Sequence, residues 1–199
     1  MEERELFAGI EKILSDNSFK KKSKLLWNKS VDEKWKWVIE FQKGKRASKG
    51  QFDMTINVGV YLMGTERLLY EKESEFANST ICFFSARPYF FGNLSSWWDF
   101  DMGGDNSAQI ADIEQSLQCK IIPFLNGHRT FDSLLENLPI KKWESNTNFH
   151  SELLRIGVGY YLLNRLTEAK SILQQVIDGG TIWGEKAKKV MDQIGCEPV

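Results

Sequence analysis

Cysteine and histidine are scarce in this sequence, and their spacing excludes several common kinds of site. The three cysteines, Cys82, Cys119 and Cys196, form no C-x-x-C pair, so neither a zinc ribbon nor a dithiol redox centre is expected. We predict reduced thiols in the cytoplasm. The two histidines, His128 and His150, have no neighbour at metal-ligand spacing. We therefore predict no metal site and assign no catalytic residue.

Long apolar stretches and phosphate-binding loops are also missing, and we do not expect a secretory leader. No stretch approaches the roughly 18 consecutive apolar residues of a membrane span, and the chain opens with the charged sequence MEERELF. No G-x-G-x-x-G or G-K-[ST] motif follows a predicted strand. We expect no membrane association and no cofactor. A hydrolase assembled from distant residues, for example Cys82 with a histidine, stays an alternative.

The sequence also has no large excess of one charge, because it contains 26 Lys and Arg residues and 27 Asp and Glu residues. This balance excludes a wholly basic nucleic-acid coat. Apolar residues make up 42% and aromatic residues 13% of the 199 positions, which is ample material for a packed core. The length suits one large domain, or one domain with a small appendage.

Hydrophobic periodicity in the first half of the chain predicts a helix followed by strands. Apolar residues recur every three or four positions from Glu2 to about Asp16, which indicates one face of a helix. Alternation over residues 19–27 and 35–42 predicts a hairpin, and residues 51–62 form the clearest strand. A short strand is expected at residues 81–86, and an edge strand between residues 89 and 106.

The second half of the chain is predicted to be helical. A helix starts near residues 105–107, and Pro123 should kink or end it; Thr130 then caps a short helix that Pro139 closes. Residues 141–148 are a plausible linker, followed by helices over about 148–163, 167–177 and 182–194. We expect an α+β domain over residues 1–140, with a mainly antiparallel sheet of four or more strands and helices on one face. A helical hairpin with a capping helix follows, over residues 148–199.

This C-terminal hairpin resembles a single tetratricopeptide repeat, in which small residues let two helices approach closely. A plain helical hairpin with an incidental pattern is the alternative. The repeat spacing is carried by Leu153, Ile156, Gly157, Tyr160, Ala169, Leu173 and Val176.

The first 138 residues carry a second resemblance. Ser18-Phe19-Lys20-Lys21-Lys22, Gln51-Phe52, Asn57-Val58-Gly59-Val60-Tyr61 and Trp97-Trp98 follow one another in an order that resembles the bacterial domain-of-unknown-function family 4304, over residues about 5–138. The resemblance implies a small bacterial cytoplasmic protein without an established activity. Some members are similar in style to immunity or antitoxin-like proteins. It supplies no catalytic residue.

The neutral total hides a polarised charge distribution. Residues 19–50 carry a net charge of +8, whereas residues 64–118 carry −6. If the first two strands pair, five lysines share one sheet face, with Lys45 and Arg46 in a loop at its end. A solvated outer face, an acidic protein partner and nucleic acid are the three interpretations that we consider. Trp35 and Trp37 lie on the opposite parity and are expected in the core. The five lysines are Lys20, Lys22, Lys24, Lys34 and Lys36.

The segment from Trp97 to Asp105 is the second candidate site. Two adjacent tryptophans in an extended segment cannot both point into one core, so at least one of Trp97 and Trp98 is a candidate contact residue. The aspartates that follow do not have the spacing of a calcium loop, and we interpret them as a turn leading into a helix N-terminus.

Together these patterns predict a non-enzymatic module that binds another macromolecule through basic and aromatic residues. A protein partner is the first interpretation, and a nucleic-acid-binding accessory protein using the same lysines is the second. The sequence does not indicate the oligomeric state.

Overall fold

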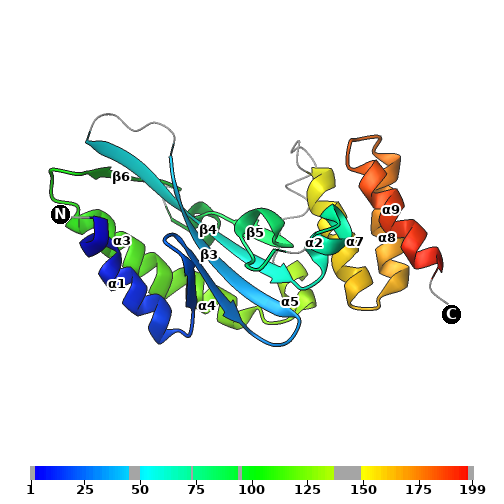
Figure 1. Ribbon diagram of the computed structural model, residues 1–199, viewed down its shortest axis with the longest axis horizontal. Coiled ribbons are helices and arrows are strands. Elements are labelled where there is room, and N and C mark those ends of the chain that lie inside the picture. The colour runs from blue at the N-terminus through cyan, green and yellow to red at the C-terminus, as the bar shows by residue number, and fades with distance from the viewer. Residues whose placement is uncertain (1–2, 45–49, 73, 94–95, 137–148, 197–199) are drawn as a thin grey trace. The chain divides into compact units, whose positions relative to one another are not determined.

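The computed structural model describes residues 3–44, 50–72, 74–93, 96–136 and 149–196 (Figure 1). Contacts divide the chain into two compact units, each described by itself below. The first unit comprises Met1–Tyr61 and Phe76–Arg129, and the second comprises Leu62–Glu75 and Thr130–Val199. The predicted linker at residues 141–148 lies outside the described residues, and the domain division at residues 140 and 148 stays a prediction.

A six-stranded antiparallel sheet forms the centre of the first unit, and it confirms the predicted α+β class. Its strands run in the order β1-β2-β3-β4-β5, and β6 also pairs with β4. Strands β1 to β5 form the expected meander, whereas β6 returns to pair with β4. The strands are β1 (Lys20–Ser23), β2 (Leu26–Ser30), β3 (Trp35–Lys43), β4 (Gln51–Leu62), β5 (Phe84–Ala86) and β6 (Trp98–Asp101).

Strand β4 is the strand that the sequence predicted most clearly, and its bounds match the alternating segment. Its first residues pair with β6, where Met54 lies opposite Trp98. Its later residues pair with β5, where Val60 lies opposite Phe84. One long strand therefore holds two short ones along the same edge.

The predicted strand over residues 19–27 is wrong in one respect, because it is divided into β1 and β2. A turn between Ser23 and Leu26 folds β1 back on β2, with an irregular register between Lys21 and Ser23. The turn lets β1 form backbone hydrogen bonds with β2 instead of lying unpaired. Strand β2 then pairs with β3 as predicted, with Trp27 opposite Ile39. The strand predicted at residues 81–86 is shortened to β5, and a 3₁₀ turn, η1 (Ser79–Ile81), precedes it.

Helices cover one face of this sheet, as the sequence predicted. They are α1 (Glu3–Asp16), α3 (Ser107–Ser116) and α4 (Ile122–Gly127) (Figure 1). The buried stripe of α1 places Phe7 edge-on against Phe41 of β3, with ring centroids 5.5 Å apart. Trp27 and Trp37 are each 1% exposed, which confirms that the alternate aromatic positions form the core.

The helix predicted around Pro123 continues through a wider turn. Helix α3 runs into the π-helical turn η3 (Leu117–Ile121), and α4 follows with Pro123 in its first turn. Proline cannot donate a backbone hydrogen bond, and its ring clashes with the carbonyl four residues earlier in a regular helix. The wider π turn is a local solution to that clash.

The second unit is helical. Helices α2 (Thr65–Tyr70) and α5 (Phe131–Glu136) belong to it, together with α7 (Phe149–Leu162), α8 (Leu166–Asp178) and α9 (Gly184–Cys196). The last three confirm the predicted C-terminal helices. A Cβ on Gly157 would lie 2.8 Å from the side chain of Leu173, so a small residue is required where α7 approaches α8. Among the described residues, no helix is long and apolar enough to cross a membrane.

Candidate functional site

The face of the sheet turned away from α1 and α3 is the candidate surface, and we call it the outer face. Trp98 points to the helices, because its indole Nε1 donates to Asp112 Oδ2 of α3 at 2.6 Å. Residues of alternate parity therefore belong to the outer face. They include Lys20, Asn28, Lys36, Val38, Glu40, Gln42, Asp53, Thr55, Asn57, Gly59, Asp99 and Asp101.

The segment of residues 76–82 lies across this outer face. Asn28 Nδ2 donates to the Ala77 carbonyl at 2.9 Å, and Ser79 donates to Glu40 Oε2 through its backbone N–H at 3.0 Å and its hydroxyl at 2.6 Å. A Cβ on Gly59 would lie only 2.4 Å from Cys82 Sγ, so the glycine makes room for this cysteine. Nothing in the sequence predicts that residues 76–82 cover the outer face.

Of the five lysines expected on one face, the structure brings Lys20, Lys22 and Lys36 to the outer face. Lys20 pairs with Asn28 and Lys36 with Ser30, while the Lys22 ammonium lies 5.2 Å from the centroid of the Phe76 ring. The other two are corrections to the prediction. Lys24 lies in the β1–β2 turn and Lys34 in the β2–β3 turn, at opposite ends of β2, because β1 folds back. Lys45 and Arg46 lie outside the described residues.

Acidic side chains near these lysines are engaged by other groups. Asp32 Oδ1 accepts hydrogen bonds from the backbone N–H groups of Lys34 at 2.7 Å and Trp35 at 2.9 Å. Glu40 accepts from Ser79, as described above. Within the described ranges, Lys20, Lys34 and Lys36 form no ion pair; Lys20 and Lys34 are exposed, and Lys36 is half-buried.

Two further lysines of the same segment turn towards the helices instead. Lys21 Nζ pairs with Glu11 of α1 and lies 5.6 Å from the centroid of the Trp27 ring. Lys29 Nζ lies 4.9 Å from the centroid of the Trp37 ring. Burial, and next the nearby Arg129 guanidinium, lower the pKa of Lys29. The basic segment therefore divides its charges between both faces of the sheet.

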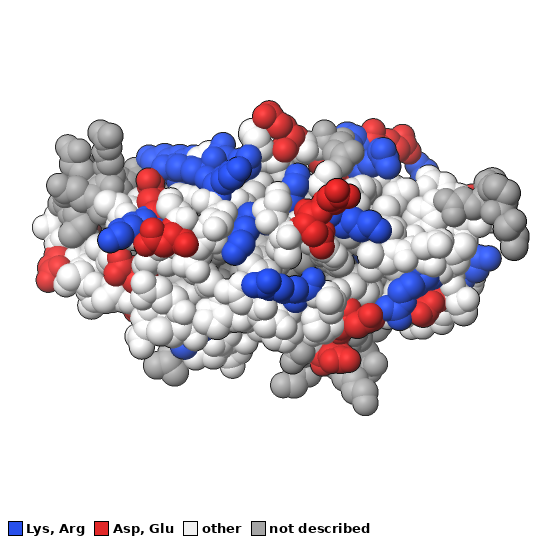
Figure 2. Space-filling model, turned by 90° about the horizontal axis from the view of Figure 1, so that it is seen from below, with Lys and Arg blue, Asp and Glu red and all other residues white. Residues whose placement is uncertain are grey.

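The acidic half of the polarised sequence contributes to the same outer face. Asp53 and Asp99 lie opposite each other on β4 and β6, as do Gln51 and Asp101. In the side that Figure 2 shows, Lys and Arg gather in several areas with Asp and Glu between them. The outer face thus carries cations on β1 and β3 and carboxylates on β4 and β6.

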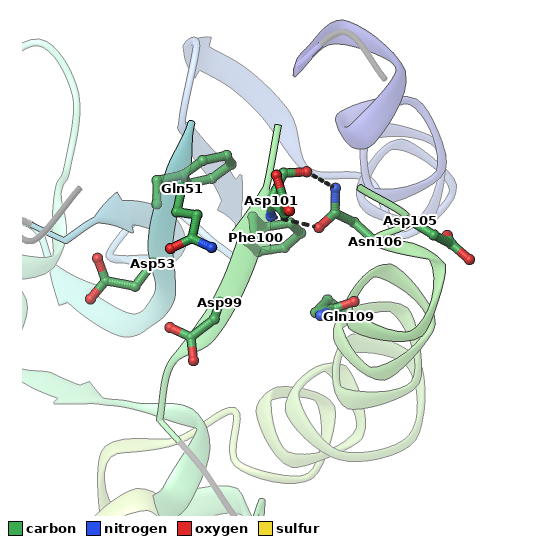
Figure 3. Close-up of a pocket in the computed structure, with 9 residues that line it drawn as sticks. Gln51, Asp53, Asp99, Phe100, Asp101, Asp105, Asn106 and Gln109 are labelled. Atoms are coloured by element: carbon green, nitrogen blue, oxygen red, sulfur yellow. Dashed lines mark hydrogen bonds between the residues drawn. The ribbon is translucent and has the colours of Figure 1, made fainter. Parts of the chain in front are cut away.

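A hollow of about 540 Å³ lies beside these carboxylates (Figure 3). Two carbonyl or carboxylate oxygens at its walls, Asp53 Oδ1 and Gln109 Oε1, are buried without a hydrogen-bond partner in the described part of the chain. Asp53 and Asp99 lie at directly opposite positions of the sheet, where like charges are unfavourable. The lining residues are Gln51, Phe52, Asp53, Asp99, Phe100, Asp101, Asp105, Asn106 and Gln109.

The turn after β6 uses two of these aspartates locally. Asp101 Oδ1 accepts from the Gly103 N–H, and Asp105 Oδ1 accepts from the Ser107 N–H, each at 2.9 Å. The hydrogen bonds from Ser107 lower the pKa of the Asp105 carboxyl. Asp105 thereby satisfies a free N–H at the start of α3. Among the described residues, no three His, Cys, Asp or Glu side chains are grouped so that they could hold a metal ion.

Trp97 and Trp98 differ in burial, as alternation along an extended segment requires. Trp98 is 6% exposed and belongs to the core, whereas Trp97 is half-buried. The guanidinium of Arg87 lies 5.1 Å from the centroid of the Trp97 ring. Trp97 is therefore the member of the pair that a partner could contact.

Each of the side chains considered for catalysis contacts a different set of residues. Cys82 is fully buried, and its thiol donates to the Asn78 carbonyl at 3.1 Å. His128 lies within the first unit, stacked on Phe124 with ring centroids 4.3 Å apart, and its Nδ1 is 2.7 Å from the Phe124 carbonyl. His150 contacts Phe149 at the start of α7.

Comparison with known proteins adds a family. The family model described as Domain of unknown function (DUF4304) matches residues 10–127, which is more than half of the chain and falls within the range of the predicted resemblance. Searches of curated proteins and of solved structures give no match. From its family match, this chain belongs to the DUF4304 family.

Proposed function

We propose that the chain is a non-enzymatic cytoplasmic module that binds an acidic protein partner through the outer face of its sheet. The observation that carries this proposal is the set of unpaired cations on that face. Lys20 and Lys36 form no ion pair within the described ranges, and the carboxylates of Asp32 and Glu40 accept hydrogen bonds from other groups. An immunity-type role, in which the chain covers another protein, is the form that the family resemblance suggests.

Electrostatic complementarity would give this contact its orientation and its association rate. Lysines on β1 and β3, on either side of β2, attract an acidic surface before close contact forms. Trp97, stacked with Arg87, would then add desolvated area. The binding step needs no chemical conversion by the chain.

Nucleic acid is the second candidate partner for the same lysines. Binding of single strands commonly uses aromatic faces on which bases stack. Trp35 and Trp37 are 7% and 1% exposed, so they present no such face. This burial is why we place the protein partner first; a hydrolase remains a third class that only an activity screen addresses.

The proposal is tested by charge reversal on the outer face. The tagged full chain and its Lys20→Glu/Lys22→Glu/Lys36→Glu variant are used for affinity capture from bacterial lysate, with and without nuclease. Each exposed charge contributes roughly 0.2–1 kcal/mol, so three reversals should lower the capture of a specific partner by about tenfold. The matched control is Lys12→Glu/Lys170→Glu/Lys188→Glu, which changes the net charge equally at exposed positions that are not part of the outer face.

Either of two results would contradict the proposal. A partner that both variants capture as well as the wild type does not use the outer face. Captured material that disappears with nuclease, and whose binding falls log-linearly with salt, would be nucleic acid. A nuclease-resistant protein that only the outer-face variant loses supports the proposal.

A further inference from the structure

An aromatic cluster lies at the surface of the first unit, between the 3₁₀ turn η2 (Pro88–Phe91) and helix α4. Phe90 lies 5.1 Å from Phe91 and 5.6 Å from Phe124, and Phe91 lies 5.1 Å from Phe124, measured between ring centroids. His128 extends the cluster by stacking on Phe124 at 4.3 Å. All four rings are only partly buried. The cluster is therefore a preformed apolar surface.

Tyr89, in the middle of η2, is 71% exposed beside this cluster. It is one of few large apolar side chains that the described residues leave so open, the others being Met102 and Ile182. A solvent-exposed tyrosine next to packed phenylalanines offers rigid contact area at low entropic cost.

Cations, and no carboxylates, occur in the two segments that build the cluster. Residues 84–93 and 117–129 contain Arg87, Lys120 and Arg129 but no Asp or Glu, although the chain has 27 acidic residues. The Lys120 ammonium lies at the end of η2, where it donates to the Gly92 carbonyl at 3.1 Å and to Asn93 Oδ1 at 2.7 Å. Arg87 immediately precedes η2, and Arg129 immediately follows His128. The two segments that form the aromatic surface thus supply three cations and no carboxylate. Two of these cations also have local partners, since Arg87 lies over the Trp97 ring and Arg129 donates to Asn126.

The η2 turn is held in place by a polar network. Asn93 Nδ2 donates to Ser116 Oγ at 2.7 Å, and Ser116 Oγ donates to the Asp112 carbonyl at 2.7 Å. Asn93 and Ser116 are 6% and 1% exposed. A surface that is already ordered loses little entropy when a partner binds.

We propose that this aromatic cluster docks an acidic peptide segment with an apolar anchor residue, supplied by a protein partner. The anchor packs against Phe90, Phe91 and Phe124, and carboxylates on either side of it meet Arg87, Lys120 and Arg129. This surface does not include the outer-face lysines, although Arg87 also contacts Trp97, and it can bind whether or not those lysines do.

Ring geometry favours a peptide over single-stranded nucleic acid here. The rings of Phe90, Phe91 and Phe124 meet edge to face, at interplanar angles of 82°, 87° and 74°. Each ring therefore packs an edge or a face against a neighbouring ring, which leaves less open ring face than a flat stacking platform has. An aliphatic or aromatic side chain can pack against such a cluster, whereas a base needs an open ring face.

The test uses the full chain, labelled with ¹⁵N, and a synthetic peptide with a central Leu-Trp pair flanked by glutamates. One control peptide replaces Leu-Trp by Ala-Ala, and another replaces the glutamates by lysines. We expect saturable amide shifts confined to residues 87–93 and 120–129 with the first peptide, and at least tenfold weaker binding with both controls. An oligo-thymidine strand is titrated in parallel.

Variants separate this surface from general charge effects. Tyr89→Ser and Arg87→Glu/Arg129→Glu should each raise the dissociation constant of the peptide several-fold, because they remove contact area or the cations that meet its carboxylates. All three side chains are exposed, so we expect the variants to fold. Ile182→Ser, at an 80% exposed position of the second unit, and Lys170→Glu/Lys188→Glu are the matched controls and should bind like the wild type.

Three results would overturn the inference. They are the lack of saturable binding at millimolar peptide, shifts that fall outside the two segments, and equal binding of the Ala-Ala peptide, which would mean charge alone. Tighter binding of the oligo-thymidine strand at these residues would also overturn it and assign the surface to nucleic acid. The outer-face proposal is unaffected by any of these outcomes, because its test changes Lys20, Lys22 and Lys36.

Discussion

Burial sets the behaviour of single charged residues in this protein more than sequence proximity does. Glu40 lies among lysines in the sequence, yet its carboxylate accepts hydrogen bonds from Ser79. Glu152 of α7 has a cation close by, since Arg155 Nη1 lies 3.6 Å from its Oε1. Even so, burial outweighs this attraction and raises the pKa of the Glu152 carboxyl.

Glu152→Gln should therefore change stability in a pH-dependent way. Because the folded-state pKa is raised, the folded state binds the proton more tightly, and the wild type loses stability as the pH rises from the unfolded value of about 4.3 through the folded pKa. The glutamine variant lacks this loss. Its melting temperature relative to wild type should be higher at pH 7 than at about pH 4, measured by thermal unfolding followed by circular dichroism.

Glu168→Gln is the control with the opposite sign. Hydrogen bonds from its own backbone N–H and from Arg165 lower the pKa of Glu168. Its contribution to stability is present above the unfolded pKa and is lost as the pH falls, so this variant should be relatively less stable at pH 7 than at acid pH. Equal pH dependence of both variants would contradict the assignment.

At the scale of elements, the segment of residues 76–82 determines what the outer face can present. This segment forms hydrogen bonds with Asn28 and Glu40 in the middle of the sheet and leaves lysines uncovered at the margins. Gly59 makes the crossing possible, because any Cβ there would overlap Cys82 Sγ. The middle of the outer face is therefore buried under residues 76–82.

Gly59→Ala should destabilise the first unit by about 1–3 kcal/mol, the usual cost of overpacking a tight site. In a Cys82→Ala background the same change should cost clearly less, because the overlapping sulfur is gone. The coupling is measured with a double-mutant cycle by urea unfolding. Gly127→Ala, where a Cβ meets no atom within 4 Å, is the control and should stay within about 0.5 kcal/mol. Additive effects of Gly59→Ala and Cys82→Ala would show that the two sites do not touch.

At the scale of the whole molecule, the second unit takes a segment from the middle of the chain. Leu62–Glu75 groups with Thr130–Val199. Within this segment, Glu66 is 1% exposed and accepts hydrogen bonds from Ser74 through its N–H at 2.6 Å and its hydroxyl at 2.8 Å. The Lys186 ammonium of α9 lies 3.9 Å from the centroid of the Tyr70 ring of α2. The Glu66 hydrogen bonds order the segment itself, and the contact between Lys186 and Tyr70 joins α2 to α9.

Leu173→Ala should lower the protection of α2 together with that of α7, α8 and α9. Leu173 is fully buried beside Gly157, and its truncation should cost about 2–5 kcal/mol. Native-state hydrogen exchange should show the amides of Thr65–Tyr70 losing protection with the C-terminal helices, while those of β3 keep theirs. If α2 keeps its protection while α7 and α8 lose theirs, the segment does not belong to the second unit.

Local periodicity was enough to predict most of the secondary structure. The alternation of residues 51–62, the apolar stripe of α1 and the three C-terminal helices each repeat with the period of their element. The predicted burial of Trp37 and of one tryptophan in the pair Trp97-Trp98 follows from the same period. Patterns of this kind are local, so one sequence contains them.

The candidate surfaces depended on contacts between distant residues, which no local pattern encodes. The turn at residues 23–26 removed Lys24 from the sheet face, the crossing segment covered Asn28, and residues 88–91 met residues 124–128 to form the aromatic cluster. The sequence by itself determined the elements, the charge polarity and the family. Only the tertiary structure decided which charges reach solvent and which aromatic rings meet, because both depend on packing between segments far apart in the chain.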